Sequence, residues 1–214
     1  MTRAKMNAPD TILDRKQRLR LQIKQRIQNI ADSTPCFDEY RRTLGRQAAR
    51  FLRESPLYRK TAMILSYSAL NTEFDTSAIN ENVMRDGKIL ALPRINTAYN
   101  TMEFFRIKPD VQLSPQLIQN RFGIWEPGRN CATVSPKQLS SALVLVPGRA
   151  FDSAGGRLGR GKSYYDLYLS RLGERGVIRI GVCFNEQMVD AVPMDTHDVG
   201  MDYILTEKGL TRCG

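Results

Sequence analysis

Glycines and basic residues alternate between Gly155 and Lys162, in the stretch GGRLGRGK. Glycine lets the backbone turn tightly and brings its N–H groups close to a ligand, while Arg157 and Arg160 add positive charge. A helix-like segment, Tyr164–Leu172, follows, and the first turn of a helix offers further unpaired N–H groups. These residue types in this order predict a phosphate-binding loop. A solvated surface turn is the alternative, because glycine-rich turns alone are weak evidence.

The same loop matches the Walker A pattern GxxxxGK[ST] at Gly156–Ser163, GRLGRGKS. In a P-loop fold the glycine loop joins a strand to a helix directly. Here PGRAFDSAG (Pro147–Gly155) separates the apolar run Ala142–Val146 from the match. No later strand ends in the acid that would help to hold magnesium. The context therefore argues against a P-loop NTPase.

Two basic residues interrupt the apolar stripe of a helix expected at Asp10–Ile30. The stripe comprises Ile12, Leu19, Ile23, Ile27 and Ile30. At about 100° per residue, Lys16 and Arg20 project into this stripe rather than opposite it. Either they snorkel around the edge of the stripe, or they serve a ligand on that face.

The remaining pattern predicts an α/β fold with a mainly parallel sheet and helices on both faces, because apolar strands alternate with helices. A second helix is expected at Phe37–Glu54 and a third at Thr76–Arg85. The expected strands are Ala62–Tyr67, Lys88–Pro93, Met102–Ile107, Ala142–Val146, Ile178–Phe184 and Tyr203–Thr206. Lys108–Lys137 looks like a long irregular excursion, and we expect one domain over residues 1–214.

The composition limits the classes of molecule that the protein could bind and the compartment it could occupy. The net charge of +10 calls for an anionic partner. Nucleic acid is one candidate, although the cations form no single block, and small polyanions explain the charge equally well. No apolar run approaches the roughly 20 residues that span a bilayer, so no membrane partner is expected. The N-terminus, MTRAKMNAPD, lacks the apolar region of a secretory signal. The four cysteines form no CxxC pair, which argues against zinc or a disulfide framework and favours the cytoplasm.

The segment VPGRAFDSAGGRLGRGKSYYDLYL (146–169) resembles the signature of the 5-formyltetrahydrofolate cyclo-ligase (methenyltetrahydrofolate synthetase) family, PG-x-x-F-D-x-x-G-x-R-L-G-x-G-x-G-Y-Y-D. Other landmarks of that family follow in order along nearly the whole chain: KQRLR (Lys16–Arg20), Glu73 in TEFDT, LPR (Leu92–Arg94), GIWEP (Gly123–Pro127), Gln187 in FNEQ, and His197–Asp198 before DYILTE. The resemblance implies a Rossmann-like sheet of the isomerase and CoA-transferase type.

The resemblance also implies a reaction that depends on ATP and Mg²⁺. The formyl oxygen of 5-formyltetrahydrofolate, with or without a polyglutamate tail, would attack the γ-phosphate of ATP. N10 would then close the ring, giving 5,10-methenyltetrahydrofolate, ADP and phosphate. Such chemistry needs positioning and charge neutralisation more than covalent help from the protein.

Site residues follow from the same resemblance. It implies Arg160 and Lys162 as catalytic cations, Glu73, Arg160 and Tyr164 as folate contacts, and Asp166 and Asp198 as magnesium ligands. The implied ATP contacts are Lys16, Arg20, Arg157, Leu158, Gly159, Arg160, Gly161, Lys162, Ser163, Tyr164 and Tyr165.

Each of these roles has a structural alternative. Asp166 would also suit the start of its helix, and Asp198 would suit a turn beside His197. Glu73 would fit the first turn of the Thr76–Arg85 helix, with Asp75 as its cap. The two tyrosines would serve as core aromatics.

Three positions depart from the family pattern. Ser163 stands where a third glycine is usual, so the loop must tolerate a Cβ there. Arg149 replaces a common apolar residue, and Phe122 takes the place of a frequent tryptophan while Trp125 lies three residues on. These departures and the charge leave open a non-catalytic nucleotide- or RNA-binding protein. A pure RNA binder has no need of Glu73.

Overall fold

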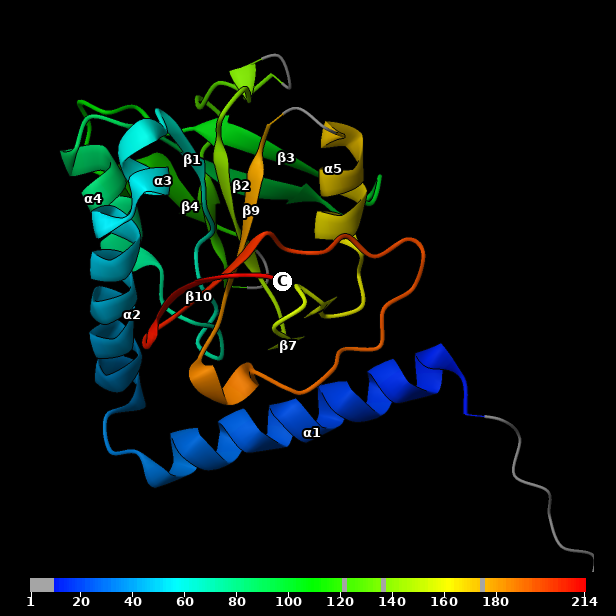
Figure 1. Ribbon diagram of the computed structural model, residues 1–214. Coiled ribbons are helices and arrows are strands. Elements are labelled where there is room, and N and C mark those ends of the chain that lie inside the picture. The colour runs from blue at the N-terminus through cyan, green and yellow to red at the C-terminus, as the bar shows by residue number, and fades with distance from the viewer. Residues whose placement is uncertain (1–9, 121–122, 136–137, 174–175) are drawn as a thin grey trace, which may run out of the picture.

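The computed structural model describes residues 10–120, 123–135, 138–173 and 176–214 (Figure 1). Three features of the sequence lie outside these residues. They are the departure at Phe122, the end of the predicted excursion at Lys137, and most of the N-terminal segment that was examined for a secretory signal. No helix in the described part is long and apolar enough to cross a membrane.

A seven-stranded sheet forms the centre, in the order β11-β10-β9-β6-β1-β2-β3. The strands β10, β9, β6, β1 and β2 run parallel to one another, while β3 and β11 pair antiparallel at the two edges. Their bounds are β1 Met63–Leu65, β2 Ile89–Asn96, β3 Thr101–Arg106, β6 Leu143–Pro147, β9 Ile178–Val182, β10 Tyr203–Thr206 and β11 Gly209–Arg212. The predicted α/β fold with a mainly parallel sheet is confirmed.

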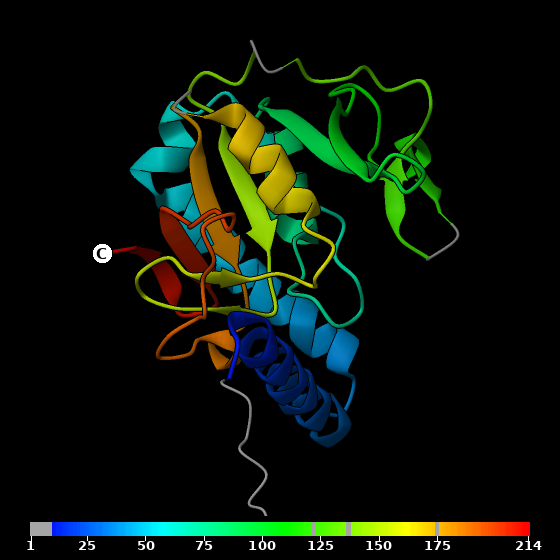
Figure 2. The same ribbon diagram turned by 90° about the vertical axis from the view of Figure 1, so that its right-hand side faces the viewer.

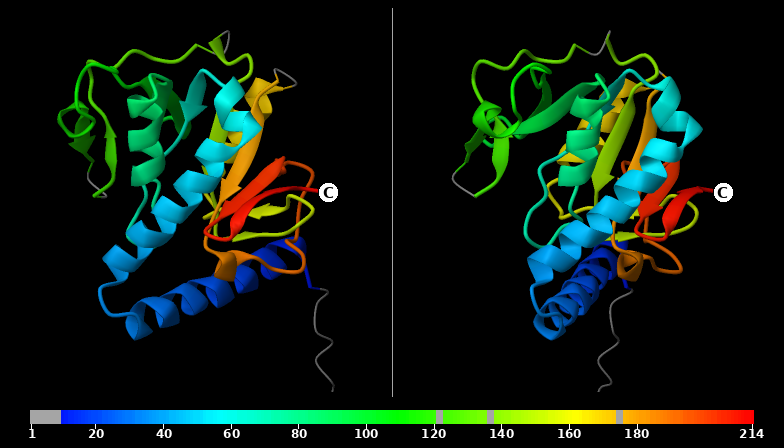
Figure 3. Two further views of the ribbon diagram at one scale, coloured as in Figure 1. Left: turned by 60° about the vertical axis from the view of Figure 1, so that its left-hand side comes forward. Right: turned by 90° about the vertical axis from the view of Figure 1, so that its left-hand side faces the viewer.

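Alternate residues of the central strands enter two separate cores, as the two-residue period of a strand requires. Ile64 and Leu145 pack in one core with Leu52 of α2 (Phe37–Glu54) and Val83 of α4 (Ser77–Arg85). The other core contains Val144 and residues of α5 (Tyr164–Leu172). Figures 1 and 3 show α2 and α4 on one face and α5 on the other. Helices therefore cover both faces, as predicted.

Helix α1 (Ile12–Ser33) crosses the end of the sheet where the parallel strands finish, as Figures 1 and 2 show. It contacts β7 (Ala150–Phe151) and the 3-10 helix η3 (Asn185–Gln187). Thr11 and Asp14 form a capping box that fixes its first turn. The short helix α3 (Pro56–Lys60), which the sequence did not predict, follows α2 after a cap at Ser55.

The predicted irregular excursion holds some regular structure. It contains the 3-10 helix η1 (Ser114–Gln116) and a hairpin of β4 (Leu117–Gln119) and β5 (Trp125–Pro127). A second small hairpin pairs β7 with β8 (Arg157–Leu158). Strands of two or three residues are too short to show periodicity, which is why the pattern did not indicate them.

The strand order creates a crevice between β1 and β6. The chain leaves β1 towards β2 and leaves β6 towards β9, on the opposite side. Ligands of open α/β sheets bind at such a switch point, beyond the carboxyl ends of the strands. In this chain the loops after β1 and β6 carry Glu73 and the glycine-rich segment.

Candidate functional site

A cavity of about 200 Å³ opens at the switch point. One wall is apolar, formed by Pro93, Ile95, Met102 and Ile124. The other lining residues belong mainly to the loops after β1 and β6 and to the start of α5. They include Glu73, Gly159, Arg160, Lys162, Ser163, Tyr164, Tyr165 and Asp166. The arrangement can accept a flat, largely apolar ring with a charged group at one end.

Asp152 organises the entry to the glycine-rich loop. Its Oδ1 accepts hydrogen bonds from the N–H of Ala154 at 3.0 Å and of Gly156 at 2.7 Å. Its Oδ2 accepts the N–H of Val192 at 2.7 Å. A Cβ at Gly156 would collide with this carboxylate, so glycine is required there. Asp152 lies within the signature, but no residue pattern in the sequence indicated this role.

Two residues of the loop adopt left-handed backbone conformations just before α5. Gly161 has φ of +94°, a region that favours glycine. Ser163, the residue before α5, has φ of +53°, within the small left-handed region that other residues can enter. The loop thus accommodates the Cβ that the family signature lacks at this position.

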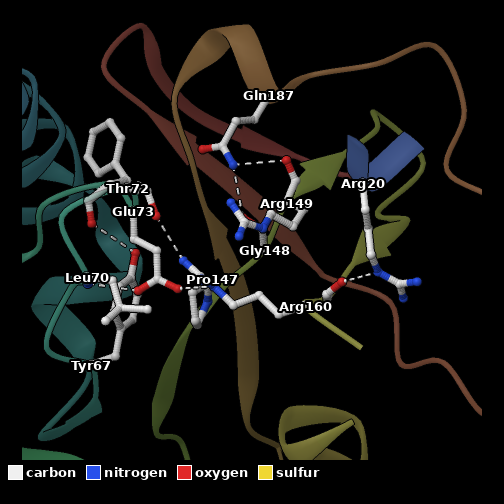
Figure 4. Close-up of polar contacts among 12 residues, drawn as sticks. Arg20, Tyr67, Leu70, Thr72, Glu73, Pro147, Gly148, Arg149, Arg160 and Gln187 are labelled. Carbon is white, nitrogen blue, oxygen red and sulfur yellow. Dashed lines mark hydrogen bonds and ion pairs between the residues drawn. The ribbon is translucent and has the colours of Figure 1, made fainter. Parts of the chain in front are cut away.

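Two cations of α1, Lys16 and Arg20, face the glycine-rich loop and the segment that carries Asp198. Arg20 Nε donates to the carbonyl of Gly159 at 2.9 Å (Figure 4). Lys16 forms an ion pair with Asp198, and its side chain is only 12% exposed. Both residues interrupt the apolar stripe because that face of α1 lies against the loop. Figure 4 shows the Arg20 guanidinium extending beyond its bond to the carbonyl.

Glu73 and Arg160 join the loops after β1 and β6. Arg160 Nε donates to Glu73 Oε1 at 2.8 Å, and Arg160 Nη2 donates to Thr72 Oγ1 at 3.2 Å (Figure 4). Glu73 Oε2 accepts the N–H of Leu70 at 3.0 Å. Glu73 lies before α4, which begins at Ser77, so it does not occupy the first turn of that helix.

Arg41 of α2 holds the turn that carries Glu73. Its buried guanidinium donates from Nη1 to the carbonyls of Leu70 at 3.1 Å and of Glu73 at 2.7 Å. Asp38 Oδ1 accepts from Nη2 of the same guanidinium at 3.1 Å. These bonds fix the Glu73 backbone relative to the sheet. No spacing in the sequence links Arg41 to Glu73.

Asp166 and Arg157 form an ion pair beneath the loop. Arg157 Nη2 donates to Asp166 Oδ1 at 2.7 Å, and Arg157 Nη1 donates to the carbonyl of Pro147 at 3.2 Å. The Arg157 side chain is only 3% exposed. The N–H of Val199, next to Asp198, also donates to Asp166 Oδ1, at 3.3 Å. The two acids predicted to bind metal are therefore brought to the same region.

Both tyrosines of the signature line the cavity and also pack against the core that contains α5. Burial raises the pKa of Tyr165, and the charge of Glu73 adds to that effect. Its Oη is buried and has no hydrogen-bond partner within the described residues. Leu158 is buried in β8, so its contribution to a ligand would come from its backbone.

Arg94 fastens the excursion beside the cavity. Its guanidinium donates to the carbonyl of Pro127 at 2.6 Å from Nη2 and at 3.0 Å from Nε, and to that of Gly128 at 2.6 Å. This contact connects two landmarks of the resemblance and places Ile124 in the apolar wall. Trp125 is half exposed.

The described residues contain no cluster of three or more His, Cys, Asp or Glu side chains able to hold a metal. Mg²⁺ in nucleotide sites usually takes only one or two carboxylates and completes its shell with phosphates and water. Asp166 and Asp198 offer hard carboxylate oxygens beside the glycine-rich loop. This donor set suits a metal that arrives with a nucleotide.

The model of the 5-formyltetrahydrofolate cyclo-ligase family matches residues 12–207. The chain is 32% identical over 211 residues to the 5-formyltetrahydrofolate cyclo-ligase of Saccharomyces cerevisiae, covering 91% of this chain and 96% of the yeast protein. It is 31% identical over 156 residues to the Mus musculus 5-formyltetrahydrofolate cyclo-ligase, covering 70% of this chain and 75% of the mouse protein.

The fold also has a solved counterpart. The NMR structure of Aquifex aeolicus 5,10-methenyltetrahydrofolate synthetase superimposes with a TM-score of 0.74 at 29% identity, covering 92% of each chain. The resemblance found in the sequence is thereby confirmed.

Proposed function

Because this chain belongs to the 5-formyltetrahydrofolate cyclo-ligase family, a family of enzymes, we propose that it converts 5-formyltetrahydrofolate and ATP into 5,10-methenyltetrahydrofolate, ADP and phosphate. The observation that carries this proposal is the 2.8 Å pair between Glu73 and Arg160. It lies where the cavity meets the cationic loop, so a ligand bound in the cavity would meet a ligand bound along the loop there.

The folate would occupy the cavity. The apolar wall of Pro93, Ile95 and Met102 suits one face of a pterin ring. Glu73 is partly buried, and its carboxylate can accept hydrogen bonds from the pterin N–H groups. Such hydrogen bonds are stronger in a site that is shielded from water. Tyr164 would contact the ring from the start of α5.

The nucleotide would lie along the glycine-rich loop. Backbone N–H groups of the loop, with Gly161 in its left-handed conformation, suit phosphate oxygens. Lys162 lines the cavity, while Lys16 and Arg20 approach the loop from α1. These positive charges would offset the repulsion between ATP and the carboxylates of the site.

The reaction would proceed in two steps. The formyl oxygen attacks the γ-phosphorus of ATP, the bond to the β-phosphate oxygen breaks, and ADP leaves. N10 then attacks the activated formyl carbon, and the carbon–oxygen bond breaks. Phosphate leaves with the oxygen, and the N10 proton departs with it. Arg160 would hold the transferring group in line and stabilise its charge, which is what phosphoryl transfer demands of a protein.

Mg²⁺ would be held by Asp166 and Asp198 together with the nucleotide phosphates. When bound, it would neutralise charge on the phosphate oxygens. Arg157 would keep the Asp166 carboxylate oriented through its bond to Oδ1, and Lys16 would do the same for Asp198.

The test is direct. Purified protein is mixed with Mg·ATP and 5-formyltetrahydrofolate, and the absorbance of the methenyl product is followed, with AMP in place of ATP as the control. Product that forms only with ATP supports the proposal. No product at high protein concentration would contradict it, and RNA binding with a steep salt dependence would then favour the non-catalytic alternative.

A further inference from the structure

Arg149 stands in the turn between β6 and β7, at the carboxyl end of the strand that borders the switch point. Its backbone is tied on two sides. The Arg149 N–H donates to the carbonyl of Leu158 at 2.6 Å, and its carbonyl accepts from Gln187 Nε2 at 2.9 Å. Gln187 is itself buried and also bonds the carbonyl of Gly148 at 2.9 Å. The position of Arg149 is therefore set by the fold.

The guanidinium of Arg149 differs from those of the other arginines at the site. Arg20 donates to a carbonyl, Arg157 to Asp166 and Arg160 to Glu73. Within the described residues, the partly buried guanidinium of Arg149 has neither a hydrogen bond nor an ion pair. Burial without a counter-ion disfavours the charged form of a side chain, so this guanidinium is available to an anionic ligand.

The surrounding charges point the same way. Burial lowers the pKa of Arg149, the neighbouring charge of Arg160 lowers it further, and Glu73 acts in the opposite direction. Glu73 already accepts bonds from Arg160 and from the N–H of Leu70. Of the two guanidinium groups, only that of Arg160 is bonded to this carboxylate, and Figure 4 shows Arg149 between Gln187 and the Arg160–Glu73 pair.

We propose that Arg149, together with Arg160, binds the terminal phosphoryl group of the nucleotide. This inference rests on the proposed function and adds a contact at a position where the family signature has an apolar residue. A phosphate suits the site better than a substrate carboxylate does. The glutamate tail lies at the far end of folate from the formyl group, whereas Arg160 and Glu73 lie where the formyl group would react.

Binding of nucleotides that differ in phosphate number tests the proposal without any turnover. Dissociation constants for ATP, ADP and AMP are measured by titration calorimetry with Mg²⁺ and without folate. The variants are Arg149→Met, Arg149→Lys and the control Arg50→Met, which removes a 77% exposed arginine of α2 that pairs with Glu54. Arg149→Met should weaken ATP binding about tenfold and AMP binding less than twofold. The ATP affinity of Arg149→Lys should lie between those of the wild type and Arg149→Met, and the affinity of the control should match that of the wild type.

Several outcomes would overturn the proposal. One is ATP affinity that Arg149→Met leaves unchanged, and another is an equal loss for ATP and AMP. A third is a loss confined to pentaglutamyl relative to monoglutamyl 5-formyltetrahydrofolate, which would assign Arg149 to a carboxylate. Thermal unfolding of each variant shows whether it folds. If Arg149→Met does not fold, the affinities of Arg149→Lys decide the test. A wild type that binds ATP but makes no methenyl product contradicts the proposed function and leaves the nucleotide series valid.

Discussion

Arg157 and Asp166 meet at 2.7 Å beneath the glycine-rich loop, with the guanidinium almost fully enclosed. The same carboxylate oxygen accepts the N–H of Val199. Asp166 therefore joins the loop, the first turn of α5 and the segment that carries Asp198. A substitution of Asp166 would therefore have two effects. It would change the predicted metal site, and it would weaken the support of the loop.

Asp166→Asn should therefore lose stability as well as turnover. The substitution leaves the buried Arg157 without a counter-charge, which costs on the order of 3 kcal/mol. The double variant Arg157→Met/Asp166→Asn should recover most of that stability, because apolar replacement of a buried ion pair is tolerated. Urea unfolding measures the stability, and turnover is measured across a range of Mg²⁺. If the double variant regains near-normal turnover and Mg²⁺ dependence, Asp166 only supports the loop.

Arg160→Ala should lower turnover far more than it weakens ATP binding. A cation that acts on charge developing in the transition state contributes on the order of 3 kcal/mol, or roughly a hundredfold in rate. Single-turnover kinetics and the dissociation constant of ATP separate the two effects. Glu73→Gln is the matched variant, because it keeps Arg160 and removes its partner. A parallel loss of ATP affinity with unchanged turnover would make Arg160 a binding residue only.

Arg41→Met should raise the KM for the folate by about tenfold while the KM for ATP changes little. The turn that carries Glu73 would lose the two carbonyl contacts that hold it, and we expect only part of that loss, about 1.4 kcal/mol, to appear in folate binding. Arg46→Met, in the same helix and exposed, is the control. Arg41→Lys should restore part of the folate affinity, and equal effects on both substrates would argue for general unfolding.

Asp86 should make the stability of the helical face depend on pH. Hydrogen bonds from Arg53, at 2.8 and 2.6 Å, and from the Tyr58 hydroxyl hold its pKa below the ordinary value. The folded pKa is depressed, so the stabilisation is present above the unfolded pKa and is lost as the pH falls through the folded one. Arg53 is about half exposed, which limits the effect to about 1 kcal/mol.

Urea unfolding of the wild type and Asp86→Asn, at pH 7 and at steps below pH 5, checks this prediction. The gap between the two proteins should be present at pH 7 and close in acid. Asp110→Asn, at an exposed position, should show no such gap. A constant difference at every pH would exclude ionisation of Asp86 as its source.

Much of the fold could be predicted because its central elements are long or periodic. The bounds of α2 and α5 match the prediction, and the inward direction of Lys16 and Arg20 followed from the 3.6-residue period. Strand β2 instead continues past the expected end at Pro93, to Asn96. Proline interrupts a central strand, but β1 pairs only with Ile89–Ala91, so the edge towards β1 is free at Pro93.

The site was predicted where the chemistry is local in the chain and was missed where it depends on tertiary contacts. Glycines and cations of the loop lie together in the sequence, so their order was informative. Arg41 and Gln187 act by bonding carbonyls of distant segments, and no residue pattern records a backbone partner. The apolar wall combines Met102 of β3 with Ile124 of the excursion, and only the antiparallel pairing of β2 and β3 brings it into place.

The pairing of β1 with β6 has a consequence for how the protein folds. Ile64 and Leu143 are neighbours in the sheet although about 80 residues separate them in the chain. Closing a loop of that length costs about 4 kcal/mol of chain entropy before any contact offsets it, and such long-range pairing slows folding. Glu73 and the glycine-rich loop lie on opposite sides of this junction. Nucleotide and folate affinity should therefore emerge only when the two halves of the sheet join, which makes ligand binding a reporter of that late folding step.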